Sequence, residues 1–231
     1  MTEITWLGHG GFHLRLVSGE TVLLDPWLDN PLYPKEFAIT SADTILVTHG
    51  HFDHLSSVPA IAIERSSLVV SNYEIGVWLE SKGVKNVVGM NKGGTAQAGG
   101  IRVTMTHAIH SSSIQDGGQL LYGGEAAGYV LHFPDGRTAY FSGDTTVFGD
   151  MRIIADLYKP ELAFLPIGDL YTMSPREAAL ACHMIRPKKV IPMHWGTFPP
   201  LTGRPAALAA AIEDLPGTEV WELEPGKTVR W

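Results

Sequence analysis

Cysteine is almost absent from this sequence of 231 residues. The single thiol, Cys182, excludes an intrachain disulfide. It lies in the apolar stretch 178–182, which indicates a buried, unreactive helix residue rather than a reactive thiol. The fold must therefore be held by an apolar core, and a chain of this length is long enough to bury one.

Long apolar runs and clustered positive charge are also missing. No segment approaches the roughly 18 consecutive apolar residues of a membrane-spanning helix, and residues 1–6 carry no basic region. We therefore expect a cytoplasmic protein without membrane insertion. The formal net charge of −7 disfavours a nucleic-acid partner, which requires clustered Lys and Arg. A small-molecule substrate fits this composition better, and association into a homo-oligomer stays open.

Short apolar runs and helical segments follow one another along the chain, and no linker divides it. We expect one domain over residues 1–231, of a layered α+β class with α/β as the alternative. Continuous apolar runs are typical of strands covered on both faces. The expected strands cover 4–7, 12–17, 21–24, 44–48, 102–106, 128–133, 138–141, 162–165, 190–193, 220–223 and 228–231.

Capping residues mark the expected helices. The run Ser174–Glu177 forms a capping box with proline at the first helical position, and it predicts a helix that ends near Pro187. Asn72 is typical of the cap of a helix over 74–81, which Gly83 would end. Further helices are expected over about 55–65, 148–157 and 206–215.

Four apolar strands run directly into side chains that can bind metals or protons. These side chains are Asp25, His49, Asp144 and His194. Residues just past the ends of strands gather along one edge of a sheet, where α/β proteins place their sites. The sequence therefore predicts a functional site at such an edge.

The strongest signal is the run His49-Gly50-His51-Phe52-Asp53-His54, directly behind a buried strand. Imidazole and carboxylate groups bind zinc-like ions, and burial of an unpaired carboxylate is costly. A chance surface cluster or a tag would not stand at this internal position. In an extended stretch His49, His51 and Asp53 can face one way, while the adjacent Asp53 and His54 point apart. This loop can thus supply two ions, two side chains to each.

Each ion needs further ligands, and three later segments can supply them. Asp144 follows a strand in the segment 142–145, and His194 follows another in the segment 193–197. His107 and His110 both follow a third strand. A lone histidine past a strand is more often a capping or supporting residue, but together with the first run these residues complete a set.

This series resembles the motifs of the metallo-β-lactamase-like superfamily over the span from His49 to His194. The shared pattern is a His-x-His-x-Asp-His run, a later His, an Asp after Ser-Gly, and a His shortly before Gly-Thr. The segments 6–9, 24–26 and 194–198 are similar to its branch of uncharacterised metal-dependent hydrolases, related to the ascorbate-6-phosphate lactonase and the N-acylphosphatidylethanolamine phospholipase D. The resemblance implies a four-layer αββα sandwich with the site at one edge.

The resemblance also implies which residues bind two divalent ions, with zinc the first choice and manganese, nickel or iron as alternatives. The implied ligands of the first ion are His49, His51 and a third histidine; those of the second are Asp53, His54 and His194; and Asp144 would bridge the two.

The third histidine is either His107 or His110. In the family this histidine usually precedes a small or hydroxyl residue and a glycine-rich loop. His110 precedes the serines at 111–113 and the glycines at 117 and 118, so we choose His110. His107 would then support a ligand from behind.

Two departures separate the chain from better-known relatives. Flavodiiron oxidoreductases of this superfamily carry Glu where this chain has His51. Many true β-lactamases carry Cys or Ser where this chain has Asp144, and they are exported. Iron redox chemistry and antibiotic hydrolysis are therefore disfavoured.

Three residues are candidates for roles beside metal binding. Asp53 can guide the proton of the nucleophile, as in relatives. His9 stands among glycines and can contact substrate or protonate a leaving group, with a turn histidine bonded to backbone as the alternative. Asp25 is expected to orient a ligand histidine. The glycine-rich loop 111–127 is expected to line the pocket, although it matches no phosphate-binding loop.

The function expected from these residues is hydrolysis of a small ester, lactone or phosphodiester. Two divalent ions about 3.5–4 Å apart lower the pKa of a shared water and present hydroxide near neutral pH. One alternative is a nuclease that acts on nucleic acid, against which the net charge argues. The other is a non-catalytic metal-binding protein, which would be expected to lack one or more ligands.

Overall fold

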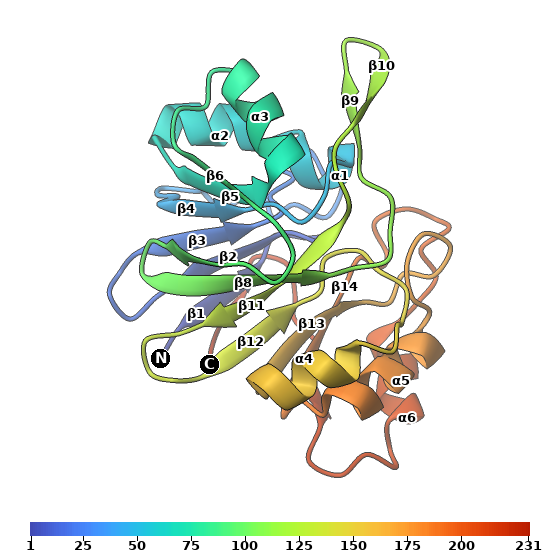
Figure 1. The fold of residues 1–231 in the computed structure, drawn as a ribbon. Helices are drawn as coiled ribbons and strands as arrows, with labels where there is room; N and C mark the ends of the chain where they lie inside the picture. The colour runs from blue at the N-terminus through green and yellow to red at the C-terminus, as the bar shows by residue number, and fades with distance from the viewer.

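Two seven-stranded sheets face each other in the computed structural model, which describes residues 1–231 (Figure 1). The first sheet has the order β16 (Thr228–Arg230), β1 (Glu3–Trp6), β2 (Phe12–Arg15), β3 (Thr21–Leu24), β4 (Thr44–Leu46), β5 (Leu68–Asn72) and β6 (Val87–Met90). The second has the order β15 (Glu219–Val220), β14 (Lys189–Met193), β13 (Leu162–Pro166), β12 (Thr138–Phe141), β11 (Ala127–His132), β8 (Ile101–His107) and β7 (Thr95–Ala98). A separate hairpin pairs β9 (Ser113–Asp116) with β10 (Gln119–Tyr122) and projects from one end of the molecule.

Helices cover the outer faces of both sheets. The first sheet is covered by α1 (Phe52–Leu55), α2 (Val58–Arg65) and α3 (Tyr73–Ser81), and the second by α4 (Met151–Tyr158), α5 (Pro175–Ile185) and α6 (Pro205–Ala211). Three apolar clusters separate the layers, with 25 buried residues between the sheets and 17 and 14 under the two helical layers. This arrangement confirms the expected four-layer αββα sandwich. None of the helices is long and apolar enough to cross a membrane.

The predicted caps are present. Ser174 accepts a hydrogen bond from the Glu177 amide while the Glu177 carboxylate accepts from the Ser174 amide, so the capping box starts α5. Asn72 ends β5 and also caps α3, because its side chain accepts from the Ile75 amide. Local polar groups therefore fix where both helices begin.

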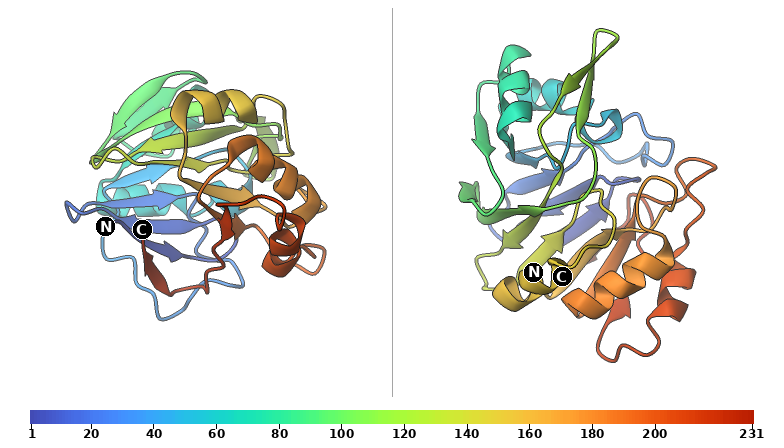
Figure 2. Two further views of the ribbon diagram at one scale, coloured as in Figure 1. Left: turned by 90° about the horizontal axis from the view of Figure 1, so that it is seen from below. Right: turned by 45° about the vertical axis from the view of Figure 1, so that its right-hand side comes forward.

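The strands expected from apolar runs form within a few residues of their predicted ends, except that the expected strand 220–223 is reduced to β15 at Glu219–Val220. The expected helix 55–65 is divided between α1 and α2. Strands β5, β6, β7, β9 and β10 were not predicted. The two chain ends lie side by side, as both views in Figure 2 show, because β16 pairs with β1.

The polar side chains that follow the strands meet where parallel strands of the two sheets end. Strands β3, β4 and β5 are parallel to one another, and so are β12, β13 and β14. Because their carboxyl ends share an edge, the residues that follow β3, β4, β12 and β14 come together from both sheets.

Candidate metal centre

The run 49–54 bridges the end of β4 and the start of α1. His51 has an extended backbone and occupies the N-cap position of α1, so Asp53 and His54 lie in the first helical turn. Gly50 lies against the segment that leads into β9, where an added Cβ would come within 2.8 Å of the Ile114 side chain. Glycine at this position therefore lets the ligand loop and the root of the hairpin pack together.

Three histidines converge into what we call the first cluster: His49, His51 and His110. Nε2 of His49 lies 3.1 Å from Nδ1 of His51, which in turn lies 3.3 Å from Nε2 of His110. Nitrogen ligands at 2.0–2.1 Å from a tetrahedral zinc ion are about 3.3 Å apart. The spacing of these ring nitrogens therefore fits a single metal ion.

A second group, which we call the second cluster, contains Asp53, His54 and His194. Oδ2 of Asp53 lies 3.9 Å from Nε2 of His54 and 3.7 Å from Nε2 of His194. His54 and His194 are fully buried, whereas Asp53 keeps a small exposed surface. His49 and His51 therefore lie in one group of candidate ligands, and Asp53 and His54 lie in the other.

Asp144 lies between the two clusters. Its Oδ2 is 3.9 Å from Nε2 of His49, 3.3 Å from Nε2 of His54 and 3.0 Å from Nε2 of His194. Gly143 has a φ of +60°, and an added Cβ would meet the Thr48 side chain at 2.7 Å. This glycine therefore lets the loop after β12 of one sheet approach the loop after β4 of the other, which places the carboxylate between them.

Asp25 holds His54 from behind. Its Oδ2 accepts from Nδ1 of His54 at 2.9 Å, and the carboxylate also accepts from the amide and hydroxyl of Thr48. A carboxylate can only accept, so the proton of His54 lies on Nδ1 and the lone pair of Nε2 points into the cluster. That Nε2 atom is buried and has no hydrogen-bond partner, and neither has Oδ1 of Asp144. Unpartnered buried atoms of this kind fit a bound cation.

The charges of the two clusters differ. Burial, opposed in part by the charge of Asp144, lowers the pKa of His49 well below its usual value, and burial also lowers the pKa of His51 and His110. Burial also acts to lower the pKa of His194, but the charge of Asp144 outweighs it and raises that pKa to about 9. The first cluster therefore offers neutral nitrogens, while the second carries a strong negative field that favours cations.

His9, which was expected to contact substrate or a leaving group, contacts Asp53 of the second cluster. It is fully buried, with Nε2 at 2.9 Å from Oδ2 of Asp53 and Nδ1 at 2.9 Å from the hydroxyl of Thr197. Burial, reinforced by the charge of His194, lowers the pKa of His9 to about 4. The neutral ring must carry its proton on Nε2 to donate to a carboxylate, so Nδ1 accepts from Thr197. Both nitrogens are occupied, and neither is free for substrate.

Three residues of the centre have a left-handed backbone. The φ angles are +54° at His9, +40° at Asp25 and +58° at His194. Residues other than glycine seldom adopt this conformation, which is held only where the surrounding structure fixes it and is concentrated at functional sites. Here the amide of His194 donates to the carbonyl of His9 at 3.0 Å, so the two loops hold each other.

His107 does not join either cluster, in contrast to the expectation that it supports a ligand. Its ring is exposed at the end of β8, where Nδ1 lies 3.0 Å from Nζ of Lys92 and the ring packs against Phe148. The chain turns after β8, and the Ile109 amide donates to the Thr145 hydroxyl. This turn brings His110, rather than His107, to the metal centre.

Three contacting residues were not singled out from the sequence. Thr48 bonds Asp25, Thr197 bonds His9, and the hydroxyl of Ser111 lies 3.1 Å from Nε2 of His51. Each lies within three residues of a predicted ligand, and this closeness in the sequence was the only indication that it could contact the site. Hydroxyl residues beside a ligand are common, however, and only the folded chain shows which ones reach a ring nitrogen or a carboxylate.

A cavity of about 740 Å³ lies over the two clusters. Its floor includes His51, Asp53, His110, Asp144 and His194. Its apolar walls come from separate segments and consist of Phe52, Leu120, Tyr171, Phe198, Pro199 and Pro200. The glycine-rich segment 111–127 lines this cavity through the hairpin, as the sequence predicted. A floor of metal-binding groups under an open cavity is the arrangement of a catalytic metal site.

Comparison with known proteins defines the class. Residues 20–195 match the family model described as the beta-lactamase superfamily domain, so the chain belongs to this superfamily. Its relatives are metal-dependent hydrolases, and so is this chain. It is 61% identical to the UPF0173 metal-dependent hydrolase of Solibacter usitatus, over 99% of this chain and 100% of that protein. It is 43% identical to a UPF0173 metal-dependent hydrolase of Methanopyrus kandleri, over 98% of each chain. Among solved structures, Igni18, a metallo hydrolase from Ignicoccus hospitalis, is 35% identical, with a TM-score of 0.88 over 99% of this chain and 97% of that one.

Proposed function

We propose that this chain hydrolyses an ester, lactone or phosphodiester bond of a small molecule with two divalent metal ions. The observation that carries the proposal is the position of Asp144, whose Oδ2 lies within 3.9 Å of a histidine Nε2 in each cluster. One carboxylate between two groups of ligands is the arrangement expected of a two-metal hydrolase.

The residues present fit such ions. His49, His51 and His110 would hold the first ion, and Asp53, His54 and His194 the second, with Asp144 shared. Imidazole and carboxylate donors suit zinc best, and manganese, nickel or iron less specifically. When bound, the ions lower the pKa of water and stabilise negative charge on the substrate. Because both sheets supply ligands, residues 1–231 would act as one catalytic unit.

The chain's own residues would orient the reaction. Asp53 reaches the cavity floor, where its carboxylate would take up the proton of the attacking water. His9 donates from Nε2 to Oδ2 of Asp53 and so fixes the orientation of this carboxylate. We therefore assign His9 to positioning Asp53 rather than to contact with substrate. Asp25 fixes the ring of His54 in the same way.

The test combines metal analysis with hydrolysis assays. Purified, untagged protein should contain about two divalent ions per chain and should hydrolyse bis-p-nitrophenyl phosphate, a p-nitrophenyl ester or a lactone. Chelation, His194→Ala and Asp144→Asn should each abolish that activity, whereas His183→Ala, a surface change beside Asp214, should leave it unchanged. Protein that binds metal but hydrolyses none of these classes would refute the proposal.

A further inference from the structure

The walls of the cavity carry large apolar side chains that water can reach. Leu120 is 70% exposed, Tyr171 57% and Phe52 43%. They come from β10, from the loop after β13 and from α1, and all three line the same cavity. Scattered apolar side chains are normal on a surface, but a set that converges on one cavity marks a binding site for apolar groups.

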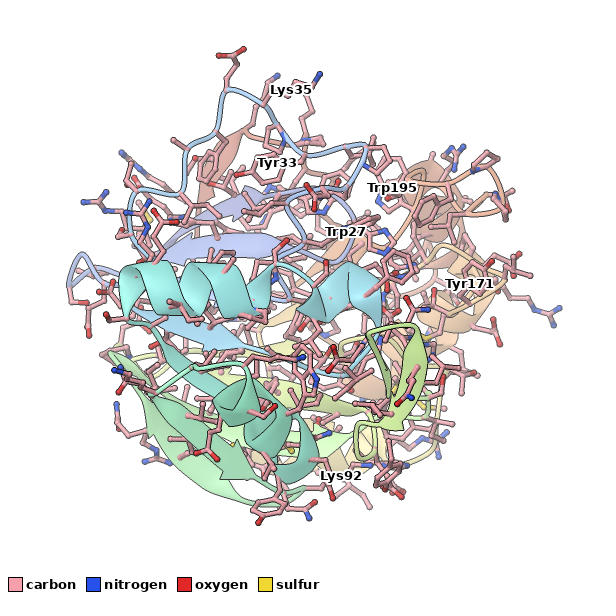
Figure 3. The ribbon with its side chains drawn as sticks, turned by 90° about the horizontal axis from the view of Figure 1, so that it is seen from above. Trp27, Tyr33, Lys35, Lys92, Tyr171 and Trp195 are labelled. Atoms are coloured by element: carbon pink, nitrogen blue, oxygen red, sulfur yellow. The ribbon has the colours of Figure 1, made fainter.

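The same cavity has no lysine or arginine side chain. None of its 14 lining residues is Lys or Arg, although the chain contains 17 of these residues. Figure 3 looks down on the molecule from above, with Lys35 toward the top of the view, Lys92 toward the bottom, Trp27 between them and Tyr171 on the right. Sites for phosphate groups normally hold Arg or Lys as the anion's partners.

A second cavity shows that the chain can build a basic surface elsewhere. A space of about 490 Å³ beside α4 and α5 is lined by four basic side chains, Arg152, Lys159, Arg186 and Lys188, against two acidic ones, Asp156 and Glu161. The charge at the metal centre is instead carried by Asp53 and Asp144, which would face the metal ions. The apolar and uncharged walls over the metal centre are therefore particular to that site.

From these walls we infer that the substrate is an uncharged carboxylic ester or lactone with an apolar arm. This inference rests on the proposed hydrolysis. The carbonyl lies over the clusters, and the arm lies between Leu120 and Tyr171. Water adds across the acyl C–O bond, so that its oxygen joins the carbonyl carbon and its hydrogen passes to the departing alcohol oxygen. No oxidant or reductant is required.

The first experiment measures kcat/KM for p-nitrophenyl acetate, butyrate, hexanoate and octanoate with metal-loaded protein. We expect about a twofold rise for each added methylene, because an open groove recovers about half the transfer free energy of a methylene group. Leu120→Ala and Tyr171→Ala should each lower the octanoate value about fivefold more than the acetate value. Leu157→Ala, an equally exposed leucine on α4, should change neither.

A second readout does not depend on activity. Octan-2-one is an uncharged ketone with the same apolar arm, and calorimetry can follow its binding to metal-free protein. Leu120→Ala should weaken this binding several-fold, whereas Leu157→Ala should not. Light scattering of the same samples tests the rival occupant, a second copy of the chain. If Leu120→Ala lowers the mass while octan-2-one binds as before, the apolar walls are a contact between copies and the inference is wrong.

The possible failures can be told apart. Ester hydrolysis with a flat chain-length profile, or with the same steep profile in Leu120→Ala and Tyr171→Ala, overturns this inference and leaves the proposed hydrolysis intact. Faster turnover of bis-p-nitrophenyl phosphate than of any carboxylic ester does the same. Absence of any hydrolysis that Asp144→Asn abolishes overturns the proposed function, and this inference with it.

Discussion

The two clusters use the same kinds of side chain but differ in depth and support. In the first cluster only His49 is fully buried and held from behind, by the Thr48 hydroxyl at 3.0 Å from its Nδ1, and His51 has the exposed Ser111 as a neighbour. In the second cluster His54 and His194 are fully buried, and both His54 and Asp53 are held from behind by other side chains. The fold has thus already ordered the second set of ligands, so we expect it to bind its ion more tightly.

Asp144→Asn should have the largest effect, because it removes the one charge that both clusters share. The loss of several kcal/mol of charge stabilisation predicts a fall in kcat of about 10³-fold or more. Both ions should bind more weakly, which titration with a fluorescent chelator would measure. Activity within tenfold of wild type, or loss of only one ion, would show that Asp144 does not act between the clusters.

His110→Ala and His107→Ala form a matched pair on one loop. Since His110 supplies one nitrogen of the first cluster, its loss should lower the affinity for the first ion by more than about 100-fold. Loss of a supporting residue typically lowers metal affinity only about 10–100-fold. The second ion should be retained. His107→Ala should bind both ions as wild type does, because His107 contacts only Lys92 and Phe148. If His107→Ala weakens binding of the first ion and His110→Ala does not, then His107 rather than His110 is the third ligand.

Asp25→Asn should affect the second cluster most, because Asp25 bonds His54 directly and reaches His49 of the first cluster only through the Thr48 hydroxyl. The carboxylate of Asp25 accepts from three donors, and an amide in its place would turn an NH₂ group toward at least one of them. We expect the second ion to bind about 10–100-fold more weakly and the first ion to be weakened much less. Equal weakening of both ions would mean that the support is shared rather than local.

His9→Gln and His9→Leu test whether His9 positions Asp53. Glutamine can keep a donor toward Oδ2 of Asp53, and leucine cannot, although both fill the site. We expect His9→Leu to lower kcat and second-ion affinity by about tenfold, the lower end for a supporting residue, with substantial rescue in His9→Gln. A change in KM alone, equal in both variants, would favour direct contact with substrate instead.

The smallest effect is expected at Cys182, which lies outside both clusters under the second sheet. Burial raises the pKa of this thiol to about 12, so almost none of it is thiolate at pH 8. Native protein should resist iodoacetamide and keep both ions and its activity, whereas unfolded protein should be alkylated. Mass spectrometry after timed labelling would measure this, and rapid labelling of the native chain would contradict the burial.

Features encoded by neighbouring residues were predictable from the sequence. The run 49–54 and the ligand-type side chains after strands identified one edge of the sheets, and Ser174 and Asn72 marked the starts of two helices. β5 was missed because a run of five residues that ends in a helix cap offers few positions for a strand pattern. The hairpin β9–β10 was missed because half of its length is exposed and glycine-rich.

The role of His9 could not be read from its surroundings in the sequence. Its two ring partners stand 44 and 188 residues away, at Asp53 and Thr197. The choice between His107 and His110 likewise depended on the turn that follows β8. In that turn the Ile109 amide donates to the hydroxyl of Thr145, which lies 36 residues further along the chain. The roles of these histidines depend on contacts between the two sheets, which cannot be predicted from the spacing of residues along the chain.

The hairpin is held at its root by Ser112 and beside its turn by Asp116, and only the turn itself is open. The hydroxyl of Ser112 accepts from the Gly50 amide and donates to the Gly123 carbonyl, and Asp116 accepts from the Trp78 and Lys82 side chains. At the tip, an added Cβ on Gly117 or Gly118 would meet nothing within 4 Å. Insertions at the tip can therefore be accepted without displacing the ligand loop. Related chains could exchange one substrate for another by varying this hairpin, and a laboratory could do so by grafting it.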